Sequence, residues 1–221
     1  MVIRVGIYDV IGVTCGTVSM VKTLSCYDVS VVTSVTTDTL CSIDVLIVGG
    51  GDARALKRTL AGAPIKALRA WLNVGGSYLG ICAGAVIACD VKQGFSLFPG
   101  IKLHRDNLVA ESGLCGTVTL AWTDAIFQSH PRPHPQLWYE NGPLMKIKST
   151  TKPIIIARYD TELAQDTILE GAMPGKVAIV CTESKGRIML SGPHIELCGT
   201  LLCDAVSWCA SVPMRQCANA S

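Results

Sequence analysis

The sequence predicts an α/β fold, with a doubly wound and mostly parallel β-sheet covered by helices on both faces. Extended and helical segments alternate over the first 90 residues, which is the pattern of parallel strands joined by crossover helices. The extended segments are short and almost continuously apolar, as expected of strands covered on both faces. The 221 residues, 49% of them hydrophobic, are enough to bury the core of one domain spanning residues 1–221.

The first half of the chain supplies the parallel part of the sheet. Its apolar runs predict strands over residues 3–8, 28–35, 43–50 and 77–81. A helical segment is expected over residues 16–24. A second is expected over residues 53–74, where leucines and alanines recur at helical spacing, with a break at Gly62 and Pro64 and an end at Gly75 and Gly76.

The second half contains more prolines and shorter strand-like pieces. Residues 95–149 are expected to form antiparallel strands and loops at one edge of the sheet, with strands over 117–122 and 137–142. Further strands are predicted over 153–159, 176–182 and 186–192, followed by a closing helix over 198–212. The last two strands are expected to form a hairpin with Gly186 in a left-handed conformation.

Charge and composition exclude several classes of partner. The net charge is only +2 and aromatic residues make up 5% of the chain, so the sequence lacks the basic stripe and the stacking side chains of a nucleic-acid-binding protein. No segment has the length of a membrane span, and the apolar N-terminal stretch lacks the charged region and cleavage site of a signal peptide. We therefore expect a cytoplasmic protein with no membrane partner.

The chain contains eleven cysteines, an odd number without C-x-x-C spacing. In the absence of a secretory context or of paired ligand spacing, we expect free thiols in a reducing compartment, with no metal site and no cofactor. Most of these cysteines are expected to be small apolar residues of the core. A cysteine with a chemical role must therefore be recognised from its neighbours.

Cys82 is distinguished by the stretch GGSYLGICAGA, in which a strand leads into a run of small residues typical of a helix start. A nucleophile elbow has this layout, because the nucleophile sits on a tight turn that tolerates only small residues two positions before and after it, here Gly80 and Gly84. The thiol would lie at a helix N-terminus, where the helix dipole favours the thiolate. The N–H of Ala83 would then be one donor to an oxyanion.

His194 and Glu196 follow the last predicted strand in the stretch GRIMLSGPHIE. Residues two apart on an extended chain share a face, so Glu196 can orient the ring of His194 and complete a Cys-His-Glu arrangement with Cys82. A lone histidine is more often a surface residue or a hydrogen-bonded core residue. Its combination with an elbow makes the catalytic interpretation the stronger one.

Two further strand ends supply candidate binding residues. The run VLIVGGGDAR ends a strand in three glycines, and Gly50 and Gly51 are candidates for a second oxyanion donor, although a simple glycine turn fits the same pattern. Asp9 follows the first strand, whose end lies on the same side of a doubly wound sheet as the elbow. It is a candidate to line the site, with a turn or cap role as the other interpretation.

In order along the chain, these stretches resemble motifs of the class I glutamine amidotransferase-like superfamily. More narrowly, they are similar to the amidotransferase-like domain at the N-terminus of eukaryotic biotin-protein ligases and in free-standing relatives. That family carries a P-G-G-A-D loop, a G-x-Y-L-G-I-C-A-G-A elbow, an F-P-G segment, a Y-N-G-G motif and a terminal S-G-P-H-P-E. The corresponding residues here are 49–52, 76–85, 98–100, 138–142 and 191–196, with Ile195 in place of the proline.

The resemblance implies a flavodoxin-like three-layer α/β/α sandwich with extra antiparallel edge strands. It further implies that Cys82 is the nucleophile, His194 the general base and Glu196 its orienting acid, with Asn141 of the Y-N-G-G-like stretch at the substrate. Glutaminases follow the elbow with polar residues, whereas this chain continues A-G-A-V-I, which argues against glutamine as substrate. No G-R-G-R-x-G-type biotinyl-adenylate loop is present, so we do not expect biotin ligation.

The leading hypothesis is a cysteine-dependent, amidotransferase-like hydrolase acting on a small amide or acyl substrate. A second hypothesis is a non-catalytic ligand-binding or regulatory module that uses the same pocket. A third is similarity to the intracellular protease and deglycase family, in which an acid from the first strand, here Asp9, activates the cysteine. The sequence indicates neither the substrate nor the oligomeric state.

Overall fold

The computed structural model describes residues 2–10, 14–92, 94–104, 113–123, 136–148, 152–165, 167–183 and 185–211. Ten of the described strands form one sheet, in which the order of the main path is β2-β1-β3-β4-β12-β11-β10-β7. The strands in chain order are β1 (Arg4–Tyr8), β2 (Asp28–Val32), β3 (Val45–Val48), β4 (Ser77–Ile81), β5 (Ile101–Leu103), β6 (Cys115–Val118), β7 (Leu120–Trp122), β8 (Leu137–Glu140), β9 (Met145–Ile147), β10 (Ile154–Tyr159), β11 (Val177–Glu183) and β12 (Arg187–Ser191).

The sheet has a parallel half and an antiparallel half. Strands β2, β1, β3, β4 and β12 are all parallel, so their carboxyl ends lie at one edge. Strands β11, β10 and β7 continue the sheet in antiparallel pairing. Strand order reverses beside β1, because β2 lies on one side of it and β3 on the other, and such a reversal is where α/β sheets open a crevice for ligands.

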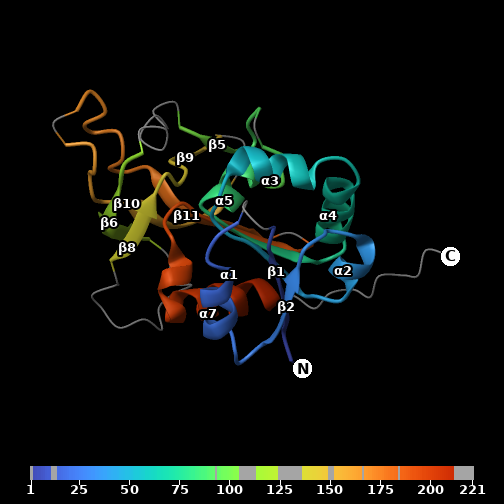
Figure 1. Cartoon of the computed structure of the whole chain (residues 1–221). Coiled ribbons are helices and arrows are strands. Elements are labelled where there is room, and N and C mark those ends of the chain that lie inside the picture. Colours follow the sequence, from blue (N-terminus) through green and yellow to red (C-terminus); the bar gives the residue numbers. More distant parts are fainter. Residues whose placement is uncertain are drawn as a thin grey trace.

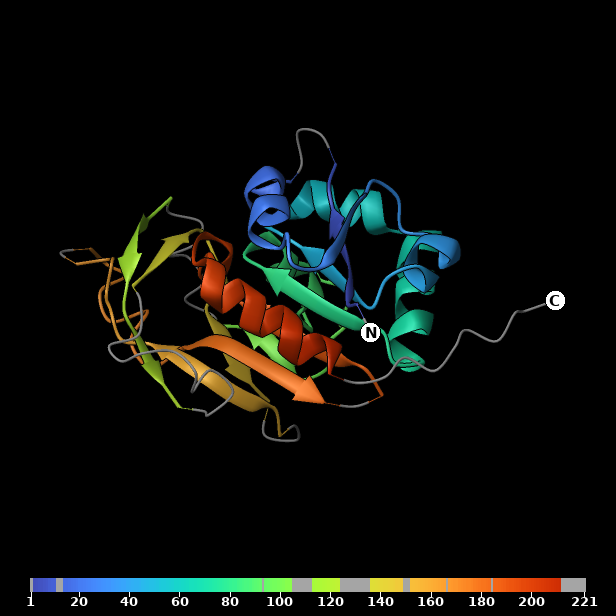
Figure 2. The same ribbon diagram turned by 90° about the horizontal axis from the view of Figure 1, so that it is seen from below.

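Helices cover both faces of the parallel half (Figure 1). One face carries α1 (Thr17–Thr23) and α7 (Gly199–Ala210), and the other carries α2 (Thr37–Cys41), α3 (Ala53–Leu60), α4 (Ala63–Asn73) and α5 (Ala83–Ala88). Figure 2 shows α7 lying over the sheet and running in nearly the same direction as the strands beneath it. The predicted three-layer α/β/α architecture, with extra antiparallel strands at one edge, is confirmed.

Two apolar cores follow from this layering. Alternate residues of each central strand enter opposite cores: Ile47 of β3 packs on the α1 and α7 side, whereas Leu46 and Val48 pack on the side of α2 to α5. All four residues of β3 and all five of β4 are buried. This is the physical reason why these strands are continuous apolar runs in the sequence.

Two local expectations need correction. The strand expected over 117–122 is two strands, β6 and β7, and β6 pairs with β8 in a separate two-stranded sheet. The hairpin of β11 and β12 is confirmed, but Gly186 is not left-handed. A Cβ at Gly186 would lie 1.9 Å from the carbonyl oxygen of Gly76, so close packing of two backbones, and not turn conformation, requires glycine there.

None of the described helices is long and apolar enough to cross a membrane.

Candidate active site

Cys82 lies between β4 and α5, at the carboxyl edge of the parallel strands. Its φ of 52° and ψ of −110° are a conformation that residues other than glycine rarely adopt. Cys82 N donates to Ser191 O at 2.8 Å, which ties the turn to the neighbouring strand β12. The turn therefore has the backbone geometry of a nucleophile elbow.

The glycines that flank the elbow have no room for a side chain. A Cβ at Gly84 would lie 1.9 Å from Val48 O, and one at Gly80 would lie 2.8 Å from Gly84 O. Gly84 N donates to Gly49 O at 3.1 Å, and the buried Tyr78 hydroxyl donates to Gly84 O at 2.8 Å. These contacts hold the start of α5 against the end of β3 and so position the thiol.

His194 and Glu196 follow β12, which is the parallel neighbour of β4. His194 Nδ1 donates to Glu196 Oε1 at 2.6 Å, and both residues are buried, with 8% and 3% of their surface exposed. His194 N donates to Trp138 O at 2.8 Å, so β8 also fixes this segment. Glu196 lies in a short 3₁₀ helix, η2 (Ile195–Leu197), so a helical turn, and not the extended chain expected from the sequence, brings the two side chains together.

The electrostatic state of His194 is set by its two neighbours. Burial by itself lowers its pKa, but interactions of the imidazolium with Cys82 and Glu196 outweigh burial and raise the pKa to about 11. Cys82 raises the pKa of His194 both as a hydrogen-bond partner of the ring and through its charge, and Glu196 does the same. The arrangement favours a protonated ring beside the thiol.

Gly50 marks the point where these side chains converge. A Cβ built at Gly50 would lie 3.0 Å from His194 Cε1 and 3.7 Å from Cys82 Cβ. The same point lies 3.2 Å from the sulfur of Cys15. Residue 50 must therefore lack a side chain for the thiol and the imidazole to approach each other.

The end of β8 and the turn after it form another side of the site. Cys82 Sγ donates to the backbone oxygen of Glu140 at 3.4 Å. Asn141 is exposed and has a φ of 53°, and a Cβ at Gly142 would lie 2.1 Å from Gly192 O. The turn is thus packed against the segment that leads to His194. The side chain of Tyr139 is fully buried and does not face a ligand.

The remaining predicted binding residues surround the same loop. Ala83 begins α5, so its N–H belongs to the first turn, where a helix leaves N–H groups unpaired. Gly51 is exposed and forms an antiparallel bridge with Thr14, whose hydroxyl donates to Asp9 Oδ1 at 2.5 Å. Asp9 therefore holds Thr14, the residue before Cys15. The proposed ligand contacts of Ala83, Gly51 and Asp9 stay predictions.

Cys15 is the residue that sequence reasoning missed. Cys15 N donates to Gly50 O at 3.1 Å, and burial raises the pKa of the Cys15 thiol, an effect that His194 opposes. The signal available in the sequence was position: Cys15 follows the first strand, whose carboxyl end faces the same crevice as the elbow. It was one of eleven cysteines, and no local motif distinguished it.

No group of three or more His, Cys, Asp or Glu side chains in the described part of the chain is arranged to hold a metal ion.

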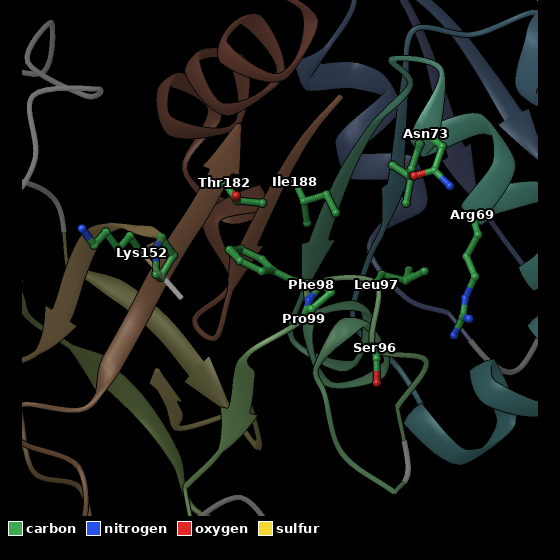
Figure 3. A pocket seen from close by; sticks show the side chains of 11 residues that line it. Arg69, Asn73, Ser96, Leu97, Phe98, Pro99, Lys152, Thr182 and Ile188 are labelled. Atoms are coloured by element: carbon green, nitrogen blue, oxygen red, sulfur yellow. The ribbon is translucent and has the colours of Figure 1, made fainter. Parts of the chain in front are cut away.

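A cavity of about 520 Å³ lies away from Cys82 (Figure 3). It is bounded by Arg69 and Asn73 of α4, by residues 96–99, and by Thr182 and Ile188 of the sheet. Ile188 pairs with Tyr78 near the start of β4, whereas Cys82 follows the end of that strand. None of the predicted site residues borders this cavity, so it is separate from the chemistry described above.

A family model matches the N-terminal part of the chain. The model described as "Biotin-protein ligase, N terminal" matches residues 4–96, a range that contains the glycine loop and the elbow. The chain is similar to this family over these residues, which are less than half of its length. His194 and Glu196 lie beyond the matched range, so their place beside Cys82 comes from the geometry alone.

A curated relative is an uncharacterised protein of Chlamydia muridarum (strain MoPn / Nigg), 25% identical over 171 residues. The match covers 69% of this chain and 60% of that protein, so the chain spans about three fifths of the relative's length.

Solved structures of low sequence identity share the fold of this chain. A glutamine amidotransferase superposes with a TM-score of 0.64 at 15% identity, covering 94% of this chain and 99% of that one. A GMP synthase component from Thermoplasma acidophilum gives 0.60 at 16% identity, covering 96% of both chains. PurLQS from Thermotoga maritima gives 0.59 at 18% identity, covering 95% of this chain and 98% of that one. At these identities the likeness concerns the fold.

Proposed function

We propose that the chain is a cysteine-dependent, amidotransferase-like hydrolase in which Cys82, His194 and Glu196 act together on a small amide or acyl substrate. One observation carries the proposal. His194 Nδ1 lies 2.6 Å from Glu196 Oε1, and the His194 ring and the strained residue Cys82 both lie next to Gly50. A strained backbone at a non-glycine residue persists only where the surrounding structure holds it, and such residues cluster at active sites. A reducing cytoplasm is the compartment we propose for this thiol chemistry.

The first step is attack of the Cys82 thiolate on the carbonyl carbon of the substrate. The thiol proton resides on His194, whose imidazolium is stabilised by the Glu196 carboxylate. Glu196 also fixes the ring with Nδ1 as donor, which leaves Nε2 for the reacting groups. Glu196 is thus a positioning residue in this scheme, and Cys82 and His194 are the catalytic residues.

Attack converts the carbonyl oxygen into an oxyanion, which needs hydrogen-bond donors. Ala83 N at the start of α5 is one candidate, and the N–H groups of Gly50 and Gly51 are others. Cys15 and Thr14 engage the opposite side of this glycine loop, through Gly50 O and the bridge to Gly51. The contact with Cys15 uses the carbonyl oxygen of Gly50 and not its N–H group.

Collapse of the tetrahedral intermediate breaks the bond to the leaving group. His194 returns its proton to the departing ammonia or amine, and Cys82 remains as a thioester. Water, deprotonated by the now neutral imidazole, attacks the thioester and releases the carboxylic acid. The Cys82 thiolate and the His194 imidazolium are restored, so the cycle is complete with respect to protons.

The small apolar residues after the elbow do not indicate the substrate class, although their place in the sequence suggested that they would. Ala85 and Ile87 are fully buried in the core on the side of α2 to α5, whereas Cys82 belongs to the core on the opposite side. They do not reach a ligand at Cys82. Selectivity for amide over other acyl groups would instead depend on the glycine loop and on the exposed side chain of Asn141.

Selective alkylation tests this proposal. Under reducing conditions at pH 7, we expect iodoacetamide to modify Cys82 at least about tenfold faster than the exposed Cys115, because the thiolate is the reactive form. Replacing His194 by alanine should remove this advantage. In Cys115→Ser, the matched control, the alkylation rate of Cys82 itself should be unchanged. Mass spectrometry of tryptic peptides identifies the modified residue. Equal modification of Cys82 and the other thiols would refute the catalytic arrangement.

A screen of amides, thioesters and short peptides then addresses turnover and substrate class. A mass adduct at Cys82 that forms and decays is expected of a hydrolase, because the thioester is an intermediate. The second candidate function, a ligand-binding module without turnover, is favoured by the contact of the Cys82 thiol with Glu140 O, which a neutral S–H donor makes. A ligand that protects Cys82 from alkylation but is never converted would support that second function.

A further inference from the structure

Cys15 supplies a second thiol to the site of Cys82. Its sulfur lies 3.2 Å from the Cβ position of Gly50, and Cys82 Cβ lies 3.7 Å from the same point. The backbone of Cys15 is anchored there by its N–H, which donates to Gly50 O at 3.1 Å. Both cysteines are free thiols in the structure. The folded backbone therefore brings the two cysteines close together.

The two thiols differ in exposure and in surroundings. Cys15 is exposed to solvent, whereas Cys82 is 6% exposed and lies beside His194. His194 Nε2 is buried without a hydrogen-bond partner among the described residues, and its ring carbon Cε1 is 3.0 Å from the point that Cys15 and Cys82 share. An imidazolium there stabilises a thiolate at Cys82, and thiolates are the form that peroxides oxidise.

We propose that Cys82 is a site of reversible oxidation and that Cys15 is its resolving cysteine, forming a Cys15–Cys82 disulfide. The proposal rests on the proposed function in one respect, the nucleophilic thiolate at Cys82. It goes beyond that function by assigning a role to Cys15 and by making the reactivity of Cys82 depend on oxidation.

The reaction requires a peroxide as oxidant. The Cys82 thiolate attacks one oxygen of hydrogen peroxide, the O–O bond breaks, and the products are a sulfenic acid at Cys82 and hydroxide. Cys15 then attacks the sulfenic sulfur, the S–O bond breaks, and water leaves as the disulfide forms. Overall the two thiols lose two electrons and peroxide gains them. A dithiol reductant reverses the bond by thiol–disulfide exchange.

The disulfide would have two consequences for the site. Cys82 Sγ would exchange its contact with Glu140 O for a bond to Cys15, so the nucleophile would be blocked. It would also be protected from further oxidation to sulfinic acid, which thiol reductants do not reverse.

Peptide mapping after peroxide treatment tests the pairing. Trypsin places Cys15 alone in residues 5–22 and Cys82 in residues 70–92 together with the fully buried Cys89. Folded protein is treated with one to a few equivalents of hydrogen peroxide, blocked with iodoacetamide and digested without reductant. We expect a cross-linked peptide of 5–22 with 70–92, whose fragment ions assign the bond to Cys82, and its loss after dithiothreitol.

Variants separate a resolving role from chance oxidation. In Cys15→Ser the cross-link should vanish. Prolonged treatment with excess peroxide should then carry Cys82 in this variant from the sulfenic acid, which dithiothreitol still reduces, to the sulfinic acid, which it does not, so Cys82 alkylation should not return. The wild type, protected by the disulfide, should recover most of it. Cys26→Ser is the matched control: Cys26 is also an exposed cysteine next to another thiol, that of Cys203. Its recovery should equal that of the wild type. Circular dichroism verifies that both variants fold.

The outcomes distinguish this inference from the proposed function. Fast alkylation of reduced Cys82 without a cross-link, or recovery in Cys15→Ser equal to wild type, would overturn the resolving role and leave the hydrolase intact. A cross-link between Cys26 and Cys203 at the same peroxide level as that of Cys15 with Cys82 would show unselective oxidation and would also overturn it. Slow alkylation of reduced Cys82 would instead refute the proposed function.

Discussion

A side chain at Gly50 would crowd the His194 ring and the Cys15 sulfur beside Cys82. A methyl group there would press on His194 Cε1 at 3.0 Å and on the Cys15 sulfur at 3.2 Å. The backbone of Gly50 is not left-handed, so alanine introduces no strain in φ. Sterics at the site, and not turn geometry, explain this glycine. The effect of a methyl group should then appear in reactivity more than in folding.

The first prediction concerns Gly50→Ala. The methyl group should displace the imidazole by a few tenths of an ångström and lower the rate of Cys82 alkylation at pH 7 by about 10- to 100-fold. The free energy of unfolding, measured by urea denaturation, should fall by only about 1–2 kcal/mol. In the control variant Gly116→Ala, the added methyl meets only a side-chain methyl of Leu163 at 3.1 Å, so the alkylation rate should be unchanged. An unaltered rate in Gly50→Ala would contradict the convergence.

The second prediction concerns the protonation of His194. Its pKa is raised to about 11 by Cys82 and Glu196 against the effect of burial, so the ring should stay protonated at pH 8, where an ordinary histidine is neutral. A raised pKa means that the proton is lost only at higher pH. The chemical shifts of the imidazole should therefore change only at pH values well above 7. Titration of ¹⁵N-histidine-labelled protein by NMR measures this, with His194→Gln used for assignment. Cys82→Ser should lower the titration midpoint, and a midpoint near 6.5 in the wild type would contradict the ion pair.

At the scale of elements, β8 and the turn after it connect the antiparallel part of the molecule to the site. Tyr139 packs edge-to-face on Tyr159, with ring centroids 5.7 Å apart, and its hydroxyl donates to Gly142 O at 2.9 Å. The same turn offers Glu140 O to the Cys82 thiol and abuts the backbone of Gly192. A buried tyrosine therefore supports a wall of the site that it does not itself line.

The third prediction is that Tyr139→Phe destabilises the fold by about 1 kcal/mol, because it leaves the buried carbonyl of Gly142 without this donor. Urea denaturation measures the loss. The alkylation rate of Cys82 should change by less than about threefold, since the hydroxyl acts on the turn and not on the thiol. Tyr27→Phe is a suitable comparison, because Tyr27 donates to Cys203 O in a partly buried place and the loss of this bond should cost less than that of a fully buried one. A larger effect in Tyr27→Phe would contradict this explanation.

At the scale of the whole molecule, topology brings the reactive groups together. Parallel β4 and β12 are neighbours, so the residues that follow each strand, Cys82 and His194, leave the sheet at the same edge. The strands β3 and β1 continue this order, which adds the glycine loop and the loop of Asp9 and Cys15 at that edge. The antiparallel strands lie on the far side of β12 and contribute the turn after β8.

The fourth prediction follows from the uneven burial of the two sheets. Every residue of β4 is buried, and four of the five residues of β12 are buried, whereas β6 has one buried residue of four. Since local opening is easiest where few apolar contacts hold a segment, amides of β4 and β12 should exchange more slowly than those of β6 by a factor of about 100 or more. Hydrogen exchange with mass spectrometry compares the peptides directly. Protection of β6 equal to that of β4 would contradict the picture of one dominant sheet.

Sequence reasoning reached the parallel half of the sheet because its signal is local. Strands β1, β3 and β4 are continuous apolar runs, and the glycines at 80 and 84 surround a cysteine at a strand–helix junction. The antiparallel region was harder to predict, because β5, β7 and β9 have only three residues each and are defined by their partners. Helix α2 has five residues and was not predicted for the same reason.

The sequence by itself determined the fold class, the elbow at Cys82 and the pairing of His194 with Glu196, since each depends on residues close together in the chain. Only the tertiary structure decided that Cys82 and His194 share one edge of the sheet. It also decided that a side chain at residue 50 would crowd the site, and that Ala85 and Ile87 face the opposite core. It also selected Cys15 from eleven cysteines. The physical reason is that these relations join strands far apart in sequence, and packing against the neighbouring strands, which no local pattern encodes, sets their positions.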